Sequence, residues 1–214
     1  MSRGRLNLPN VITIARISVC PLIFWLAVSP SVAARFWAFA LFVVAAVSDA
    51  WDGYLARRYD LITDMGKLLD PVADKLLLAA TMIPVYLISH RGGVLDPVPF
   101  WGPLPTWVLI VIFGREIFMT AFRSYAVKQG VVISAGAAGK WKVVFQMVFI
   151  GAVFLWYPLL EIADMGAWSS GIWVIGAQFV RAVVGITLIG AIVLTVYSML
   201  DYLWSYRTLV GIRD

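Results

Sequence analysis

Six long apolar runs dominate this sequence and restrict the folds that it can adopt. A helix needs about 20 apolar residues to cross the roughly 30 Å hydrocarbon core of a bilayer. Runs of about this length lie at residues 10–29, 36–56, 68–89, 104–127, 141–160 and 180–204. Backbone groups in lipid must be satisfied within the chain, and long apolar runs do so as helices. We therefore predict an all-α integral membrane protein with six transmembrane helices, in a single domain covering residues 1–214.

The composition agrees with a membrane protein and excludes a soluble fold. Hydrophobic residues make up 62% of the 214 residues and charged residues only 14%, whereas soluble domains carry about 45–50% and about 25%. The net charge of +5 indicates anionic lipid or phosphate as a partner, and not nucleic acid. The single cysteine, Cys20, excludes an intrachain disulfide, and the single histidine, His90, excludes a cluster of histidine metal ligands.

Basic residues predict the orientation of the chain. They are concentrated before the first run, after the last, and in the two loops on the same side of the membrane. These residues are Arg3, Arg5, Arg57, Arg58, Lys67, Lys128, Lys140, Lys142, Arg207 and Arg213. By the positive-inside rule, both termini and the two basic loops face the cytoplasm, and we expect a polar active-site cavity on that side. Residues 1–9 are expected to lie along the membrane surface, and residues 171–181 fit either an interfacial segment or part of the last span.

Four aspartates form the most informative polar cluster. Asp49 and Asp52 end the second run three residues apart, and Asp70 and Asp74 open the third run four residues apart. Both spacings place side chains on one helix face, and the short loop between the runs predicts antiparallel neighbours whose four carboxylates converge. Oxygen ligands without Cys or His suit hard cations such as Mg²⁺, Mn²⁺ or Ca²⁺. Two such ions would balance four carboxylates and could clamp phosphate oxygens; the alternative is a solvated loop in which nearby Arg and Lys side chains pair with the acids.

A second charged cluster lies in and beside the fourth and fifth runs. It contains Arg115, Glu116, Arg123, Lys140 and Lys142. Arg binds phosphate in a bidentate manner and Lys as a point charge, so these cations suit a phosphorylated acceptor. Anchoring on the positive side of the membrane remains the alternative for Lys142, and an ion pair with Glu116 remains the alternative for Arg115.

The aspartates belong to a longer string with fixed spacing. It reads Asp49-Ala-Trp-Asp52-Gly53-Tyr-Leu-Ala56-Arg57, then Gly66, Asp70 and Asp74 after gaps of eight, three and three residues. This string resembles the signature of the CDP-alcohol phosphotransferase family. Similarity to the branch of the family that uses sn-glycerol 3-phosphate extends over nearly the whole chain, through Pro9-Asn10 with Thr13 and Arg16, Arg115-Glu116-Ile117, Gly139-Lys140 with Lys142, and Tyr197-Ser198-Met199-Leu200.

The resemblance implies a role for each residue of the string. Asp49, Asp52, Asp70 and Asp74 would hold two divalent cations, Mg²⁺ or Mn²⁺, and Asp74 would also be the catalytic base. Gly53, Ala56, Arg57 and Gly66 would bind CDP-diacylglycerol. Arg115, Arg123, Lys140 and Lys142 are the candidates for binding the acceptor phosphate.

The implied activity is transfer of a phosphatidyl group from CDP-diacylglycerol to sn-glycerol 3-phosphate, with release of CMP, in a bacterial cytoplasmic membrane. The resemblance also implies a homodimer surrounded by membrane lipids. Two alternatives remain open: a member of the same family with another acceptor (inositol phosphate, serine or phosphatidylglycerol), or an ion-coupled transporter that uses the buried acids as a cation path.

Overall fold

The computed structural model describes residues 8–59, 63–91, 98–131, 136–166 and 171–207, without the side chains of residues 8, 54–57, 64 and 67. It contains six α-helices and, within these residues, no strand. The helices are α1 Leu8–Val28, α2 Val32–Arg58, α3 Asp64–Ser89, α4 Thr106–Lys128, α5 Ala137–Met165 and α6 Ile172–Ser205. The predicted all-helical membrane fold is confirmed. The proposed surface segment, residues 1–9, lies largely outside the described residues, since α1 begins at Leu8.

Five of the six helices are long and apolar enough to cross a membrane: α1, α2, α3, α5 and α6. Helix α4 has 23 residues, which corresponds to about 35 Å at 1.5 Å per residue. Arg115, Glu116 and Arg123 fall in one stretch of α4 and interrupt its apolar run. The crossing of α4 therefore stays a prediction, and its charged residues need partners inside the protein.

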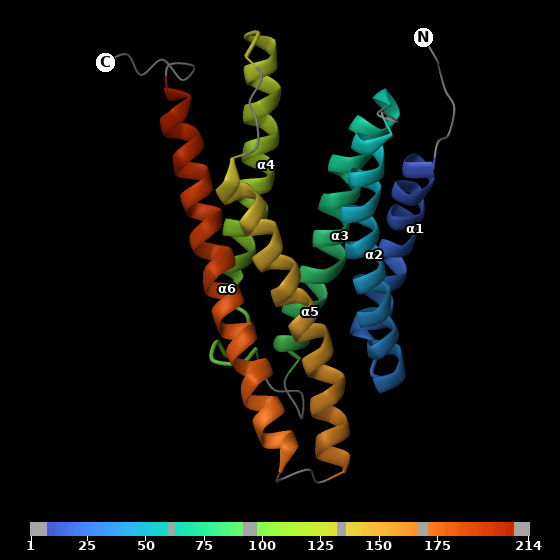
Figure 1. Ribbon diagram of the computed structural model, residues 1–214. Coiled ribbons are helices and arrows are strands. Elements are labelled where there is room, and N and C mark those ends of the chain that lie inside the picture. Colours follow the sequence, from blue (N-terminus) through green and yellow to red (C-terminus); the bar gives the residue numbers. More distant parts are fainter. Residues whose placement is uncertain (1–7, 60–62, 92–97, 132–135, 167–170, 208–214) are drawn as a thin grey trace.

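The helices alternate in direction, as Figure 1 shows. Helix α1 begins and α6 ends at the upper end of the bundle in that view, which is also where α2 ends and α3 begins. Residues 172–181 form the first turns of α6, which runs unbroken to Ser205. The stretch 171–181, ambiguous in the sequence, is thus an extension of the last helix and not a separate segment.

Helix α1 lies between α2 and α3, and this corrects one expectation from the sequence. Within the described residues, α1 packs extensively against both α2 and α3, whereas α2 and α3 are not an extensively packed pair. A short connecting loop requires only that the ends of two helices lie close together. The helices can diverge beyond the loop, and a third helix then fills the space between them.

The core lies between the α1–α3 group and the long helices α5 and α6. Phe42 of α2 meets Phe154 of α5 with ring centroids 5.8 Å apart, and Arg35 of α2 forms an ion pair with Glu161 of α5 near the lower end. At the same end, the hydroxyls of Tyr86 and Thr106 lie 3.0 Å apart and join α3 to α4. Toward the upper end, α3 and α4 diverge (Figure 1). The polar residues predicted to form the site lie in this upper half.

Candidate active site

Two helices carry the four aspartates to the upper half of the bundle. Asp49 and Asp52 lie on the last turns of α2, and Asp70 and Asp74 lie on α3. The sequence predicts a third helix from residue 68, but α3 begins four residues earlier, at Asp64. Thr63 caps this helix, because its Oγ1 accepts a hydrogen bond from the Gly66 amide at 3.0 Å. The capped start adds about one turn that the apolar pattern does not show.

Arg16 of α1 joins three of the four carboxylates. Its Nη1 forms a hydrogen-bonded ion pair with Asp49 Oδ1, and its Nη2 forms one with Asp52 Oδ2. Nη1 also lies 3.6 Å from Asp74 Oδ1. One guanidinium group from α1 therefore contacts acids from both α2 and α3.

Thr13 lies one turn before Arg16 and reaches the fourth carboxylate. Its Oγ1 is 3.2 Å from Asp70 Oδ1 and 3.5 Å from Asp52 Oδ2. It is also 3.1 Å from the Pro9 carbonyl oxygen, and the single hydroxyl proton can be donated to only one of these oxygens at a time. The predicted convergence of the four acids is thus observed, and α1 is the element that brings it about.

No role for Arg16 or Thr13 was predicted from the sequence, although the sequence contains a signal for Arg16. Arg16 is a basic residue within the first apolar run. A charged side chain at membrane depth requires a partner, and the nearest acidic cluster in the sequence was the four aspartates. Thr13 offered no such signal, because a threonine can satisfy its hydroxyl on its own helix backbone.

Oxygen donors suit hard divalent cations, and the four carboxylates fit this donor chemistry. In the described part of the chain, no three Asp, Glu, His or Cys side chains are placed together in an arrangement that could hold a metal ion. Arg16 contacts one oxygen each of Asp49, Asp52 and Asp74, and a metal ion could bind the same oxygens. Asp49 and Asp74 still present exposed side chains, 44% and 60% accessible, toward the outside of the cluster.

The residues predicted to bind CDP-diacylglycerol lie beside the acids. Gly53 follows Asp52 on α2 and is partly buried. Ala56 and Arg57 lie on the last turns of α2, and their side chains are outside the described residues. Gly66 packs tightly: a Cβ atom there would lie 2.9 Å from Asn10 Oδ1 and 3.2 Å from Thr63 Oγ1. A side chain at this position would have to displace the Asn10 and Thr63 side chains where the start of α3 meets α1.

The second charged cluster joins α4, α5 and α6. Glu116 Oε1 accepts hydrogen bonds from Arg115 Nη1, at 3.1 Å, and from Lys142 Nζ. Arg115 Nη2 also lies 3.3 Å from Ser198 Oγ on α6. Arg115 and Lys142 are buried, and their two positive charges face one carboxylate, so the group of three carries a net positive charge.

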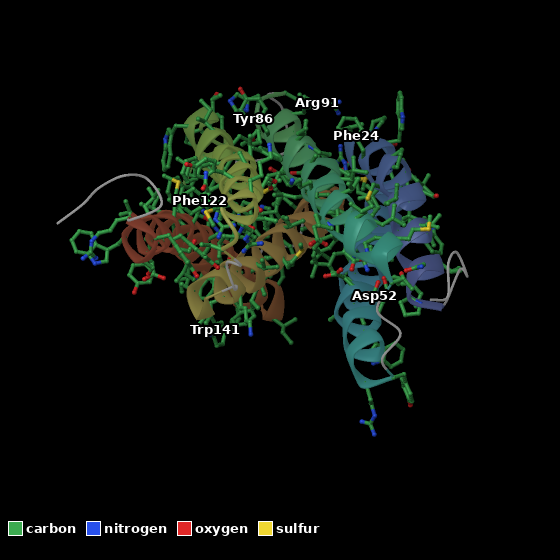
Figure 2. All side chains as sticks on the ribbon, turned by 90° about the horizontal axis from the view of Figure 1, so that it is seen from above. Phe24, Asp52, Tyr86, Arg91, Phe122 and Trp141 are labelled. Carbon is green, nitrogen blue, oxygen red and sulfur yellow. The ribbon has the colours of Figure 1, made fainter. Side chains whose placement is uncertain are left out.

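The other two predicted cations lie at the edge of this cluster. The Arg123 guanidinium is 5.9 Å from the centroid of the Tyr202 ring, and the Tyr202 hydroxyl accepts a hydrogen bond from the Gly136 amide at 2.8 Å. Lys140 is exposed. The structure thus brings Arg115 and Lys142 together in the interior and leaves Lys140 at the surface. Viewed from above, Asp52 lies on the side formed by α1–α3, and Phe122 and Trp141 lie on the side formed by α4–α6 (Figure 2).

Comparison with known proteins identifies the family. The family model described as CDP-alcohol phosphatidyltransferase matches residues 6–197. The chain belongs to this family. In this CDP-alcohol phosphatidyltransferase, the signature string runs from the end of α2 to the start of α3, where the four acids meet.

Curated relatives agree with this assignment. A probable phosphatidylglycerophosphate synthase of Mycobacterium tuberculosis is 34% identical over 97% of this chain and 86% of its own length. A CDP-diacylglycerol–glycerol-3-phosphate 3-phosphatidyltransferase of Bacillus subtilis is 32% identical over 78% of this chain and 86% of its own length. An Arabidopsis thaliana enzyme with the same name, numbered 2, is 37% identical over 69% of this chain, and the match spans 64% of that longer protein.

Proposed function

We propose that this chain transfers the phosphatidyl group of CDP-diacylglycerol to sn-glycerol 3-phosphate and releases CMP. The observation that carries the proposal is the pairing of two sites in one half of the bundle. Four carboxylates of the family signature converge on one side, and a buried cluster of net positive charge lies on the other. The first suits a diphosphate bound with divalent cations, and the second suits a phosphorylated acceptor. The names of the relatives support the same pair of substrates.

In this proposal Asp49, Asp52, Asp70 and Asp74 hold two divalent cations, Mg²⁺ or Mn²⁺. The cations would neutralise the diphosphate oxygens and stabilise the charge that develops during displacement. Asp74 accepts the proton of the acceptor hydroxyl. That oxygen forms a bond to the phosphatidyl phosphorus, the bond from this phosphorus to the CMP oxygen breaks, and CMP leaves with the electron pair.

The remaining site residues bind the two substrates. Gly53, Ala56, Arg57 and Gly66 hold the CDP-diacylglycerol nucleotide beside the acids, where small side chains allow close approach to the α2 backbone. Arg115, Arg123, Lys140 and Lys142 hold the acceptor phosphate. The site faces the cytoplasm of a bacterial cell, because the basic residues of the sequence are concentrated at this end. We also propose that the enzyme acts as a homodimer within the lipid bilayer.

An acceptor panel tests the proposed reaction. Purified protein in liposomes is supplied with CDP-diacylglycerol, Mg²⁺ and one acceptor, and CMP release is measured. The acceptors are sn-glycerol 3-phosphate, free glycerol, serine, inositol phosphate and phosphatidylglycerol. We expect release with sn-glycerol 3-phosphate, and far less with free glycerol, because the buried cations recognise the phosphate.

Other outcomes of the panel point to the alternatives. Faster CMP release with another acceptor would assign the chain to a different reaction of the same family. No CMP release with any acceptor, together with cation flux across the liposome membrane, would favour a transporter. The double variant Asp49→Asn/Asp52→Asn is the inactive control, since it removes two of the four carboxylates.

A further inference from the structure

The depth of Arg16 relative to the acids is the basis for a new inference. The Arg16 side chain is 1% exposed, whereas those of Asp52, Asp49 and Asp74 are 8%, 44% and 60% exposed. Arg16 thus forms the floor of the cluster, and the carboxylates lie between it and the outside. A ligand that approaches from outside meets the acids before it meets Arg16. This arrangement argues against direct contact between Arg16 and a substrate phosphate.

We infer that Arg16 is a positioning residue. It holds the carboxylates together before divalent cations bind, and its ion pairs with them weaken when the cations bind. The inference rests on the metal dependence in the proposed function. Without a counter-charge, the close carboxylates on α2 and α3 would repel one another and separate the two helices. Those helices are held mainly through α1, so a guanidinium on α1 is well placed to oppose this repulsion.

The charges predict how Arg16 and the cations affect each other. Four carboxylates carry four negative charges, and Arg16 neutralises one of them. Two divalent cations would neutralise all four, which leaves Arg16 with less net attraction to the cluster. Arg16 therefore stabilises the cation-free protein more than the cation-bound protein. By thermodynamic reciprocity, it must weaken cation binding by the same factor.

The variant Arg16→Gln tests this coupling, because Gln keeps a polar side chain but removes the charge. Mn²⁺ affinity is measured by titration with electron paramagnetic resonance, and thermal unfolding is followed in EDTA and in Mn²⁺. We expect the variant to bind Mn²⁺ about ten-fold more tightly, within the usual range for coupled sites. In EDTA, the melting temperature of the variant should be lower than that of the wild type. Mn²⁺ should restore most of this loss, so the rise in melting temperature on adding Mn²⁺ should be larger for the variant than for the wild type.

Arg35→Gln is a matched control at the other end of the bundle. Arg35 is also buried, on α2, and forms an ion pair with one acid, Glu161. Loss of a purely structural ion pair should lower the melting temperature equally in EDTA and in Mn²⁺ and leave Mn²⁺ affinity unchanged. If Arg16→Gln behaves in this way, or binds Mn²⁺ more weakly than the wild type, the inference is wrong.

Two further results complete the test. Arg16→Lys keeps a charge but cannot bridge two carboxylates as a guanidinium does. We expect its Mn²⁺ affinity and melting temperatures to lie between those of the wild type and Arg16→Gln. If Arg16→Gln does not fold even in Mn²⁺, the Mn²⁺ affinity and melting temperatures of Arg16→Lys decide the test in the same way. Absence of Mn²⁺ binding by the wild type would overturn the metal dependence in the proposed function. Mn²⁺ binding by the wild type without coupling to Arg16 would overturn only the present inference.

Discussion

Among the four motif acids, Asp74 combines proximity to Arg16 with high exposure. Its Oδ1 lies 3.6 Å from Arg16 Nη1, and its side chain is 60% exposed, against 8% for Asp52. A base must reach the hydroxyl of an incoming acceptor, and the exposed side chain of Asp74 leaves its carboxylate accessible to one. The exposure of Asp74 thus supports the role that the family resemblance assigns to it.

Asp74→Asn should abolish turnover and retain binding of CDP-diacylglycerol. Asn keeps the size of the side chain but cannot accept the proton, and general-base catalysis is worth roughly 10²–10⁴-fold in rate. Initial rates of CMP release give kcat, and equilibrium binding of CDP-diacylglycerol gives the affinity. A variant with near wild-type kcat would place the base at another residue.

Lys140 and Lys142 offer a second comparison at the residue scale. Lys142 is 2% exposed and bonded to Glu116, whereas Lys140 is exposed. A charge-assisted contact in the interior is worth about 1.5–3 kcal/mol, and an exposed ion pair is worth about 1 kcal/mol or less. The two lysines lie two residues apart on the same helix. A difference between the effects of their substitutions on KM is therefore due mainly to the difference in burial.

Lys142→Gln should therefore raise KM for sn-glycerol 3-phosphate by roughly ten-fold to a hundred-fold, and Lys140→Gln by only a few-fold. Neither change should affect KM for CDP-diacylglycerol much, because both lysines lie on α5, away from the α2–α3 acids. Steady-state kinetics with each substrate varied in turn provides the measurement. Equal KM effects of the two changes would contradict the interior position of the phosphate site.

At the scale of helices, small residues allow α5 and α6 to pack closely, as is common in membranes. A Cβ atom at Gly190 of α6 would collide with the ring of Phe145 on α5, whereas one at Gly176, nearer the start of the same helix, would meet no atom within 4 Å. This pairing also brings together Lys142 of α5 and Ser198 of α6, both in the charged cluster.

Gly190→Ala should destabilise the protein, and Gly176→Ala should not. Overpacking typically costs about 1–3 kcal/mol, and a chain of this size loses roughly 2–4 °C in melting temperature per kcal/mol. Thermal unfolding in detergent measures both variants. Adding Phe145→Ala to Gly190→Ala should remove much of the penalty, and additive losses in the double variant would show that Phe145 is not the cause.

At the scale of the whole molecule, the structure divides the proposed chemistry between two groups of helices. Helices α1–α3 gather the acids, and α4–α6 gather the buried cations, while α2 and α5 join the groups through Phe42, Phe154 and the Arg35–Glu161 pair. Helices α3 and α4 diverge at the upper end (Figure 1), and from above Asp52 lies on the α1–α3 side while Phe122 and Trp141 lie on the α4–α6 side (Figure 2).

Removal of divalent cations should therefore stop the reaction without unfolding the protein. We expect EDTA to abolish CMP release and Mg²⁺ or Mn²⁺ to restore it, because the diphosphate would otherwise face four carboxylates. The helical circular-dichroism signal should persist in EDTA, since Arg16 holds the acids. Full activity after exhaustive chelation would exclude the proposed two-cation mechanism.

The sequence by itself determined the helical membrane fold, the approximate extent of the helices and the family, since each depends on local pattern. Run length specifies a spanning helix. The family motif can be recognised from the spacing of Asp49, Asp52, Asp70 and Asp74 without knowledge of how the helices pack. The sequence could not determine which helices are neighbours, because apolar residues surround most of a membrane helix and do not mark the face that meets protein. Only the tertiary structure placed α1 between α2 and α3, brought Arg16 and Thr13 to the acids, and separated buried Lys142 from exposed Lys140. Those contacts join residues far apart in the chain, and packing of the helices against one another decides them.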